Sequence, residues 1–428
     1  MNALQQYAYE LAINQRKNIF ITAAGGTGKS YLIQQIYSSM SSIYNVGMTS
    51  LTGISSNLLN GQTLHSFLGI GLGTDSHDIL FKKIMSWGFM KNRWCRLDVL
   101  IIDEVSMLSS ELLEKLEQLA RDIRSDARPF GGIQLIFSGD FLQLPMIDTD
   151  QFCFESPVWT KCIDETVLLK QIMRQRDPVF AEILNQIRVG NINEEHKKII
   201  ETRCKKYKNT DGILPTKLYS TNALVDLVNN KYYSALDGPE YKYNIAYSWK
   251  KGAANRRHYE SLVKLPYKLK LKRGSQVMHL VNAPNGSLFN GSRGVVVDFV
   301  DGAPLVKFMN GITSTIGLSC LDIKSTDTNR IVMSYKQIPL KLAWAITIHK
   351  SQGSTIDLVK INFERIFECG QFYVALSRCT SLDGLYLYNL DWNLIKTNPR
   401  ALDYYKKLED LDRRANELTQ KSTHTNAA

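Results

Sequence analysis

A glycine-rich segment, AAGGTGKS at residues 23 to 30, has residue types that can hold a phosphate group. It lies between a short apolar run and a helical pattern, so that backbone N–H groups and a helix N-terminus would surround phosphate oxygens. There Lys29 would reach the β- and γ-phosphates and Ser30 would ligate Mg²⁺. Ala23 replaces the first glycine of the usual GxxxxGK[ST] pattern, so a chance glycine-rich turn is the competing interpretation. The expected phosphate-binding residues are Gly25, Gly26, Thr27, Gly28, Lys29 and Ser30.

Two acids, Asp103 and Glu104, end the apolar run VLIIDE. After a phosphate loop, the first acid of such a pair can hold Mg²⁺ and the second can act on an attacking water as a general base. Taken alone, the pair could equally be solvated acids at the end of a strand. Together with the glycine-rich segment, it predicts a site that hydrolyses a nucleoside triphosphate.

Three further residues could contact the γ-phosphate. Gln143 follows the apolar run IFSGD, at a position where a glutamine can sense that group. Arg174 and Arg378 lie outside the first 150 residues and could bring positive charge to the transition state in a cleft shared by two domains. Each arginine alone would more often form a surface salt bridge.

The elements that must position these residues alternate between short apolar runs and helical stretches, which predicts βαβ units on a parallel sheet. Residues 268 to 335 differ, because short β-type runs there are separated by PNG, NG and DG turns, the pattern of a small β-barrel. We therefore expect an α/β protein with one domain over residues 1–175, a second over 176–428, and the barrel inserted in the second at 268–335.

Composition indicates an ordinary globular protein with a polyanionic partner. The 428 residues are 44% hydrophobic and carry a net charge of +11, which favours nucleic acid. The seven cysteines form no CxxC pair, so we expect a reducing intracellular compartment, cytoplasm or nucleus. We expect no membrane association and no mitochondrial targeting, since the sequence has no long apolar run and no arginine-rich amphipathic start.

Several longer segments closely resemble the PIF (petite integration frequency) helicases of superfamily 1B, in that family's order and spacing. Some of the motifs are shared with RecD-like enzymes. The matching segments are TSLTGISSNLLNGQTLHSFLGIGLG (49–73), IIDEVSMLSSELLEKLE (101–117), RPFGGIQLIFSGDFLQLP (128–145), FESPVW (154–159), AWAITIHKSQGSTID (343–357) and GQFYVALSRCTSLDGLYL (370–387).

The resemblance implies an ATP-driven, Mg²⁺-dependent 5′-to-3′ DNA helicase that acts in replication, repair or recombination. It implies two RecA-like domains, a small wedge element at about residues 70–97 and an SH3-like barrel insert. Gln6 corresponds to the glutamine that contacts adenine, although Gln5 is its neighbour and leaves the register open by one residue. The roles implied at the phosphates are those of Lys29, Ser30, Asp103, Glu104, Gln143, Arg174 and Arg378.

The same resemblance implies a path for DNA across both domains. Hydroxyl and backbone groups can hold phosphates there, and aromatic rings can stack on bases without choosing a sequence. An ordinary core phenylalanine at 67 and interior histidines at 65 and 349 are the competing interpretations. The implied contacts are Thr52, Gly53, His65, Phe67, His349, Ser351 and Gln352, with Asn222 as a weaker candidate.

The basic run at residues 250–273 could extend this path into the barrel, or could be only a solvated face. The expected partners are single-stranded and forked DNA, with G-quadruplexes and R-loops as further candidates, and the expected state is a monomer. Two alternatives stay open. The chain could be a RecD-like or RNA-directed motor, or a nucleotide-switched protein that clamps single-stranded DNA without unwinding it.

Overall fold

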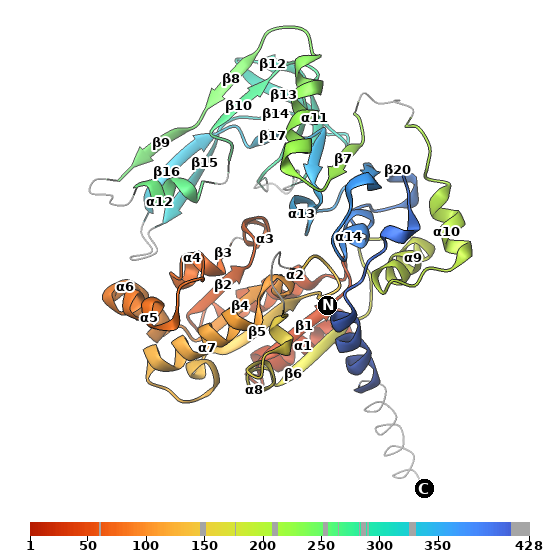
Figure 1. The fold of residues 1–428 in the computed structure, drawn as a ribbon. Coiled ribbons are helices and arrows are strands. Elements are labelled where there is room, and N and C mark those ends of the chain that lie inside the picture. The colour runs from red at the N-terminus through yellow and green to blue at the C-terminus, as the bar shows by residue number, and fades with distance from the viewer. Residues whose placement is uncertain are drawn as a thin grey trace.

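Two parallel sheets and a group of antiparallel sheets make up the molecule, as the computed structural model shows (Figure 1). The first parallel sheet lies in the lower half of Figure 1, the second in the upper right, and the antiparallel strands in the upper left. The described residues are 1–59, 61–145, 151–175, 177–207, 213–250, 256–263, 265–281, 283, 288, 291–324 and 331–411.

The first sheet has the strand order β3-β2-β4-β5-β1-β6, with every described pair of neighbours parallel. Strands β1, β4 and β5 are buried along their whole length, which explains why the sequence shows continuous apolar runs there. The elements are α1 Ala3–Ile13, β1 Ile19–Ala23, α2 Lys29–Met40, β2 Val46–Ser50, α3 Gly53–Leu58, β3 Gln62–Thr63, α4 Leu64–Leu68, α5 His77–Ser86, α6 Gly88–Arg96, β4 Val99–Asp103, α7 Ser110–Arg124, β5 Gln134–Gly139, α8 Trp159–Cys162 and β6 Glu165–Leu169.

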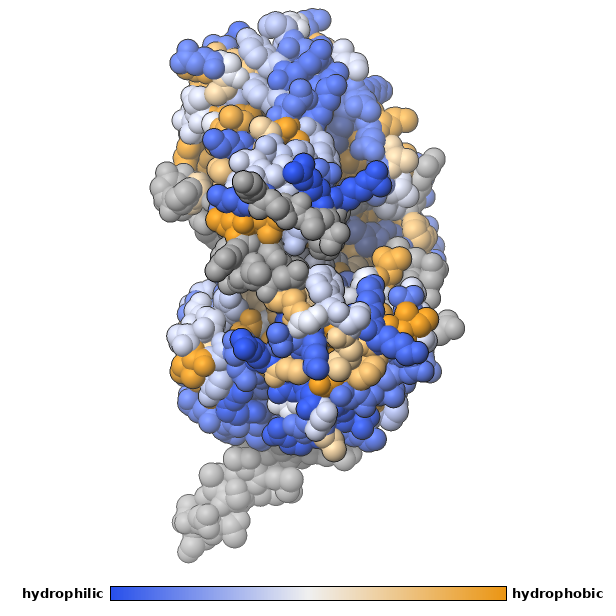
Figure 2. All heavy atoms as spheres, turned by 90° about the vertical axis from the view of Figure 1, so that its left-hand side faces the viewer, coloured by the Kyte–Doolittle hydropathy of each residue, from blue (hydrophilic) through white to orange (hydrophobic). Residues whose placement is uncertain are grey.

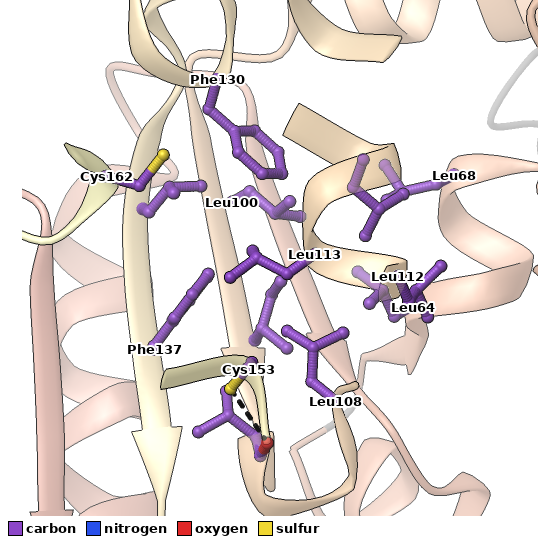
Figure 3. Close-up of a cluster of buried hydrophobic side chains, with 14 of the residues drawn as sticks. Leu64, Leu68, Leu100, Leu108, Leu112, Leu113, Phe130, Phe137, Cys153 and Cys162 are labelled. Atoms are coloured by element: carbon purple, nitrogen blue, oxygen red, sulfur yellow. Dashed lines mark hydrogen bonds between the residues drawn. The ribbon is translucent and has the colours of Figure 1, made fainter. Parts of the chain in front are cut away.

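Helices α5 and α6, in the predicted wedge region, share a hydrophobic core with this domain. Trp94 on α6 is fully buried, and its indole Nε1 donates a hydrogen bond to the Leu68 carbonyl at 3.1 Å. Leu80 and Ile84 of α5 belong to the same cluster. Figure 3 shows part of this core, with Leu68 of α4, Leu113 of α7 and Leu100 of β4 among its side chains. Helices α5 and α6 both pack against α7.

The second parallel sheet has the order β18-β7-β19-β20. One face of β7, β19 and β20 is buried, and a core cluster there includes residues of α9 and α14. The elements are α9 Pro178–Arg188, α10 Glu194–Glu201, β7 Thr216–Tyr219, α11 Asn222–Ser234, β18 Ala345–Thr347, α13 Ile348–Ser351, β19 Val359–Asn362, α14 Gln371–Ser377 and β20 Leu385–Tyr388.

Three antiparallel sheets interrupt this second domain, with orders β10-β8, β14-β13-β12-β11-β17 and β15-β16-β9. The expected limits of 268 and 335 are too narrow, because β8 and β9 pair with β10 and β16, and β17 pairs with β11. The elements are β8 Tyr241–Asn244, β9 Ala246–Trp249, α12 Arg256–Ser261, β10 Lys268–Leu271, β11 Gln276–His279, β12 Arg293–Val300, β13 Ala303–Phe308, β14 Thr313–Thr315, β15 Ser319–Lys324, β16 Ile331–Gln337 and β17 Leu340–Leu342.

A helix over residues 399–411 follows the second domain and packs on the first, as Figure 1 shows in dark blue. Ala401 and Tyr405 are buried in the core cluster of the first domain. The Tyr405 hydroxyl lies 2.5 Å from the Thr22 hydroxyl and accepts a hydrogen bond from the Phe141 backbone N–H at 3.1 Å. The first domain is thus completed by a segment that the sequence placed in the second.

The outer face shown in Figure 2 is mainly hydrophilic, and an upper and a lower lobe meet there at a narrower waist. Among the described residues, no helix has both the length and the apolar character needed to cross a bilayer.

Candidate nucleotide and DNA site

A pocket of about 380 Å³ opens where the first domain meets the second. Its first-domain wall includes Lys29, Glu104 and Gln143, together with Arg174 from the segment after β6. Arg378, at the end of α14, lies on its second-domain wall. The structure therefore brings together all five residues expected to act on the γ-phosphate.

The glycine-rich segment forms a tight loop between β1 and α2. Gly26 and Gly28 both have φ of +86°, and Gly28 precedes the first residue of α2. The Lys29 ammonium donates hydrogen bonds to the carbonyl oxygens of Ala23 and Ala24, at 2.7 and 3.0 Å. Burial lowers the pKa of Lys29 below its usual value. The lysine is thus held inside its own loop, at the rim of the pocket.

Asp103 is the last residue of β4, and Glu104 follows it with a left-handed backbone, φ 59° and ψ 43°. Such a conformation is costly for a residue other than glycine, and it turns the Glu104 side chain into the pocket. Burial and the adjacent Asp103 carboxylate raise the pKa of Glu104 to about 7. Burial also raises the pKa of Asp103. A buried carboxylate at Asp103 and a partly buried one at Glu104, adjacent in the chain, favour a cation between them and a bound phosphate.

Ser30 and Asp103 fit the expected binding of Mg²⁺. Mg²⁺ prefers hard oxygen donors and is usually bound through one or two carboxylates together with substrate phosphates. Ser30 lines the pocket at the start of α2, and Asp103 lies buried at the end of the neighbouring strand. Among the described residues, no cluster of three histidine, cysteine or acidic side chains forms a separate metal site.

Arg174 and Arg378 lie at the interface of the domains, but only Arg378 comes from the second. Arg174 follows β6, and its backbone N–H donates to the Gly26 carbonyl at 3.1 Å. Its guanidinium reaches across to the Ser377 carbonyl at 3.0 Å. Burial and the Arg174 charge lower the pKa of Arg378 to about 9. A buried guanidinium at Arg378 and a partly buried one at Arg174 face one pocket, which favours an anionic ligand between them.

We expect Arg174→Ala and Arg378→Ala each to lower DNA-stimulated ATP turnover far more than they weaken DNA binding in the absence of nucleotide. Removing one such cation costs about 10³ to 10⁵ in rate where its role is known. Turnover and oligonucleotide affinity should be measured on the same preparation. Equal losses in both quantities would show that the arginines contact DNA instead.

Gln143 is held by a buried ion pair that the sequence analysis missed. Its Nε2 donates to Asp140 Oδ2 at 3.2 Å, and the Arg188 guanidinium contacts both oxygens of Asp140 at 2.7 and 3.0 Å. Although burial opposes ionisation, Arg188 holds the pKa of Asp140 below its usual value. Arg188 is the last residue of α9, the first helix of the second domain. Gln143, which is expected to contact the γ-phosphate, is therefore connected to that helix through Asp140 and Arg188.

Asp140→Ala should destabilise the protein by about 3 to 5 kcal/mol, because it leaves the Arg188 charge buried without a counter-charge. Chemical denaturation followed by tryptophan fluorescence would measure the loss. Asp383→Ala is the matched control, because Asp383 is an exposed acid that pairs with Arg203. It should leave the unfolding midpoint almost unchanged. An equal midpoint for the two variants would mean that the Asp140–Arg188 pair contributes nothing.

Of the two glutamines considered for adenine contact, Gln5 lies beside the phosphate loop and Gln6 does not. Gln5 is 5% exposed, and its Nε2 donates to the Thr27 carbonyl in the phosphate loop at 3.2 Å. Gln6 is exposed and bonds Glu10 along the outer face of α1. Helical geometry explains the difference, since neighbouring positions point about 100° apart. The capping box in which Gln5 bonds Asn2 is a sequence signal for the position of Gln5 at the start of α1.

Tyr373 is a further residue that sequence reasoning missed. It lies buried on α14, and its hydroxyl accepts a hydrogen bond from the Gly25 backbone N–H at 2.8 Å. That N–H belongs to the loop expected to surround phosphates, so Tyr373 links the loop directly to the second domain.

The first-domain residues that are expected to contact DNA differ in how far contacts within the protein already engage them. Thr52 and Gly53 lie at the start of α3, and the Thr52 hydroxyl accepts from the Ser55 N–H at 3.1 Å. Burial lowers the pKa of His65. Phe67 is partly buried, with the Arg93 guanidinium 4.7 Å from its ring centroid. This packing favours a structural role for Phe67.

The candidates of the second domain have protein partners in this arrangement. His349 Nε2 lies 3.2 Å from Glu368 Oε2, and the Ser351 hydroxyl donates to the Ile348 carbonyl at 2.7 Å. Gln352 is 3% exposed and bonds Glu104. Asn222 is exposed, and its Oδ1 accepts from the Lys350 ammonium at 2.7 Å. Contact with DNA would therefore require rearrangement at Ser351 and Gln352, which are buried.

The basic run at 250–273 lies partly outside the described residues, at 251–255 and 264. In its described part, Lys270 pairs with Glu240 at 3.3 Å, and the Lys272 ammonium donates to the Leu236 carbonyl at 2.7 Å. Lys268 and Arg273 are exposed. Two of the four charged residues at β10 thus have protein partners.

Comparison with known proteins identifies the family. A family model described as PIF1-like helicase matches residues 1–198. The ATP-dependent DNA helicase RRM3 of Saccharomyces cerevisiae is 35% identical, over 95% of this chain and 67% of its own length. The chain belongs to the PIF1-like helicase family. The ATP-dependent DNA helicase PIF1 of Danio rerio is 39% identical over 94% of this chain, which spans 63% of that relative's length.

Solved structures of the family share the architecture of two RecA-like domains with an antiparallel insert. Pif1 helicase from Candida albicans is 35% identical with a TM-score of 0.79, over 95% of this chain and 99% of that one. Unliganded Pif1 from Bacteroides sp is 27% identical with a TM-score of 0.79. Bacteroides Pif1 bound to ssDNA is 26% identical with a TM-score of 0.65. Each comparison covers 96% of this chain and 97% of the Bacteroides chain. By this score the arrangement here is closer to the unliganded Bacteroides form than to the ssDNA-bound form.

Proposed function

We propose that this chain is an ATP-dependent 5′-to-3′ DNA helicase that translocates on single-stranded DNA as a monomer and unwinds duplex or structured DNA in replication, repair or recombination. The observation that carries the proposal is the pocket lined by Lys29, Glu104 and Gln143 on one wall and Arg378 on the other. Because both domains contribute, ATP binding and hydrolysis would open and close the cleft. The expected substrates are single-stranded and forked DNA, with G-quadruplexes and R-loops as further candidates.

In this proposal, bound ATP with Mg²⁺ supplies the phosphoryl group and the metal's positive charge. Lys29 leaves its loop carbonyls to contact phosphate oxygens, and Gln5 contacts the adenine. Glu104 accepts a proton from the attacking water, while Arg174 and Arg378 stabilise the charge that develops on the phosphoryl group. Gln143 contacts the γ-phosphate and transmits its presence through Asp140 to α9.

An RNA-directed motor and a clamp on single-stranded DNA are the competing functions. The clamp is less well supported, because a clamp needs nucleotide binding but no general base, and Glu104 is held in a costly conformation at the pocket. ATP turnover should be measured with single-stranded DNA and RNA of one sequence, beside displacement of a labelled strand. Stronger stimulation by DNA with strand displacement supports the proposal. Turnover without displacement would favour the clamp.

A further inference from the structure

The expected general base is already occupied by a residue of the other domain. Gln352 Nε2 donates a hydrogen bond to Glu104 Oε2 at 2.9 Å. Glu104 follows β4 in the first domain, and Gln352 follows α13 in the second. The other amide atom of Gln352, Oε1, is buried without a hydrogen-bond partner among the described residues. Glu104 is therefore what orients the Gln352 side chain.

This hydrogen bond affects what Glu104 can do. A water that attacks the γ-phosphate must hydrogen-bond to a Glu104 oxygen before it can transfer its proton there. In this arrangement the Gln352 amide competes with the water for Oε2, and it fixes the direction in which the carboxylate points. Glu104 is thus engaged with the second domain in this arrangement of the cleft.

Gln352 also belongs to the segment that is proposed to contact DNA. His349, Ser351 and Gln352 share one short turn, and each has a protein partner here. Gly353 directly follows with φ of +77°, a backbone conformation that favours glycine and allows the chain to turn sharply. Because Gln352 is buried, it cannot bond DNA and Glu104 in the same position.

We propose that Gln352 is a latch with two positions. Without DNA it holds Glu104, and single-stranded DNA in the cleft draws it away, which frees the carboxylate to accept the proton of the attacking water. The inference rests on the proposed function and adds how DNA would switch on ATP hydrolysis at that site. The reaction itself is unchanged: the water oxygen bonds to the γ-phosphorus, the bond to the ADP oxygen breaks, and the water proton goes to Glu104.

A latch of this kind requires reciprocal coupling, since a bond that DNA must break opposes DNA binding. Removing the acceptor should therefore tighten binding of single-stranded DNA even without nucleotide. A hydrogen bond to a charged group is strong enough to change that affinity by about tenfold. The effect should vanish when Gln352 cannot form the bond.

A double-mutant cycle tests this with a labelled oligothymidylate and no nucleotide. Glu104→Ala should tighten its binding about tenfold in the wild-type background and leave it unchanged in a Gln352→Leu background. Glu104→Gln controls for charge, because it removes the negative charge and keeps an oxygen that can accept from Gln352. Equal tightening in both backgrounds would mean that only charge repulsion was relieved, and would overturn the latch.

A second readout separates the latch from the proposed function. Gln352→Leu should raise ATP turnover without DNA several-fold and lower the ratio by which DNA stimulates it. If the wild-type protein binds DNA and is stimulated by it, but the cycle is additive, only the latch fails. If the wild-type protein binds no single-stranded DNA, the proposed function fails. Should Gln352→Leu not fold, affinity gained by Glu104→Ala but not by Glu104→Gln supports the latch, and equal gain refutes it.

Discussion

Replacing Lys29 by alanine should abolish ATP hydrolysis and leave the fold intact. The lysine is the compact charge closest to the expected phosphates, and no other side chain at the loop could replace it there. Within the described part of the chain, its hydrogen bonds go to Ala23 and Ala24 in its own loop, so their loss breaks no described contact between domains. Steady-state turnover with and without single-stranded DNA, beside a circular dichroism spectrum, measures both expectations.

Lys17→Ala is the matched control for this variant. Lys17 lies just before β1, and its ammonium nitrogen is 3.0 Å from Glu165 Oε1. Both side chains of this pair are partly exposed. Its loss should leave turnover close to that of the wild-type protein. A folded Lys29→Ala protein that hydrolyses ATP at the wild-type rate would show that the pocket is not the hydrolytic site.

Replacing Glu104 by glutamine should lower turnover by about 10² to 10⁴ while nucleotide binding is kept, because the water loses its base and the loop keeps its phosphate contacts. Glutamine has nearly the same shape and can still accept a hydrogen bond from Gln352. Binding of a fluorescent ATP analogue and single-turnover hydrolysis should be measured together. The two measurements separate a defect in chemistry from a defect in binding.

Glu111→Gln serves as the control, since Glu111 is an exposed acid on α7 that pairs with Lys115 one turn away. It should change neither quantity. If Glu104→Gln instead lost nucleotide binding and kept hydrolysis of what it bound, the roles assigned to Asp103 and Glu104 would have to be exchanged.

Local pattern was enough to predict the elements that carry the phosphate site. The sequence has apolar runs at 18–23, 99–103 and 133–140 and helical patterns at 30–40 and 110–123. They correspond to strands β1, β4 and β5 and to helices α2 and α7. These elements are strongly patterned because the strands are buried on both faces and the helices on one. The ends of these strands, where Asp103 and Glu104 lie, could therefore be recognised from local pattern.

Features that depend on contacts between distant segments could not be predicted in this way. Asp140 and Arg188 form their ion pair across 48 positions, and Tyr405 returns to Thr22 across 383. Neither pair leaves a periodic signal. The insert was expected to begin at 268 because β8 and β9 are short and become recognisable as strands only through pairing with β10 and β16. Gln5 and Gln6 are neighbours on α1, and the packing of this helix on the first domain decides which of them faces the phosphate loop.

Strand displacement on matched forks tests the central claim most directly. Two forks with the same duplex should be compared, one with only a 5′ single-stranded tail and one with only a 3′ tail, each with ATP and Mg²⁺ and with Lys29→Ala as the inactive control. We expect displacement of the labelled strand on the 5′-tailed fork and almost none on the 3′-tailed fork. Displacement restricted to the 3′-tailed fork, or on neither fork despite DNA-stimulated ATP turnover, would contradict a 5′-to-3′ helicase.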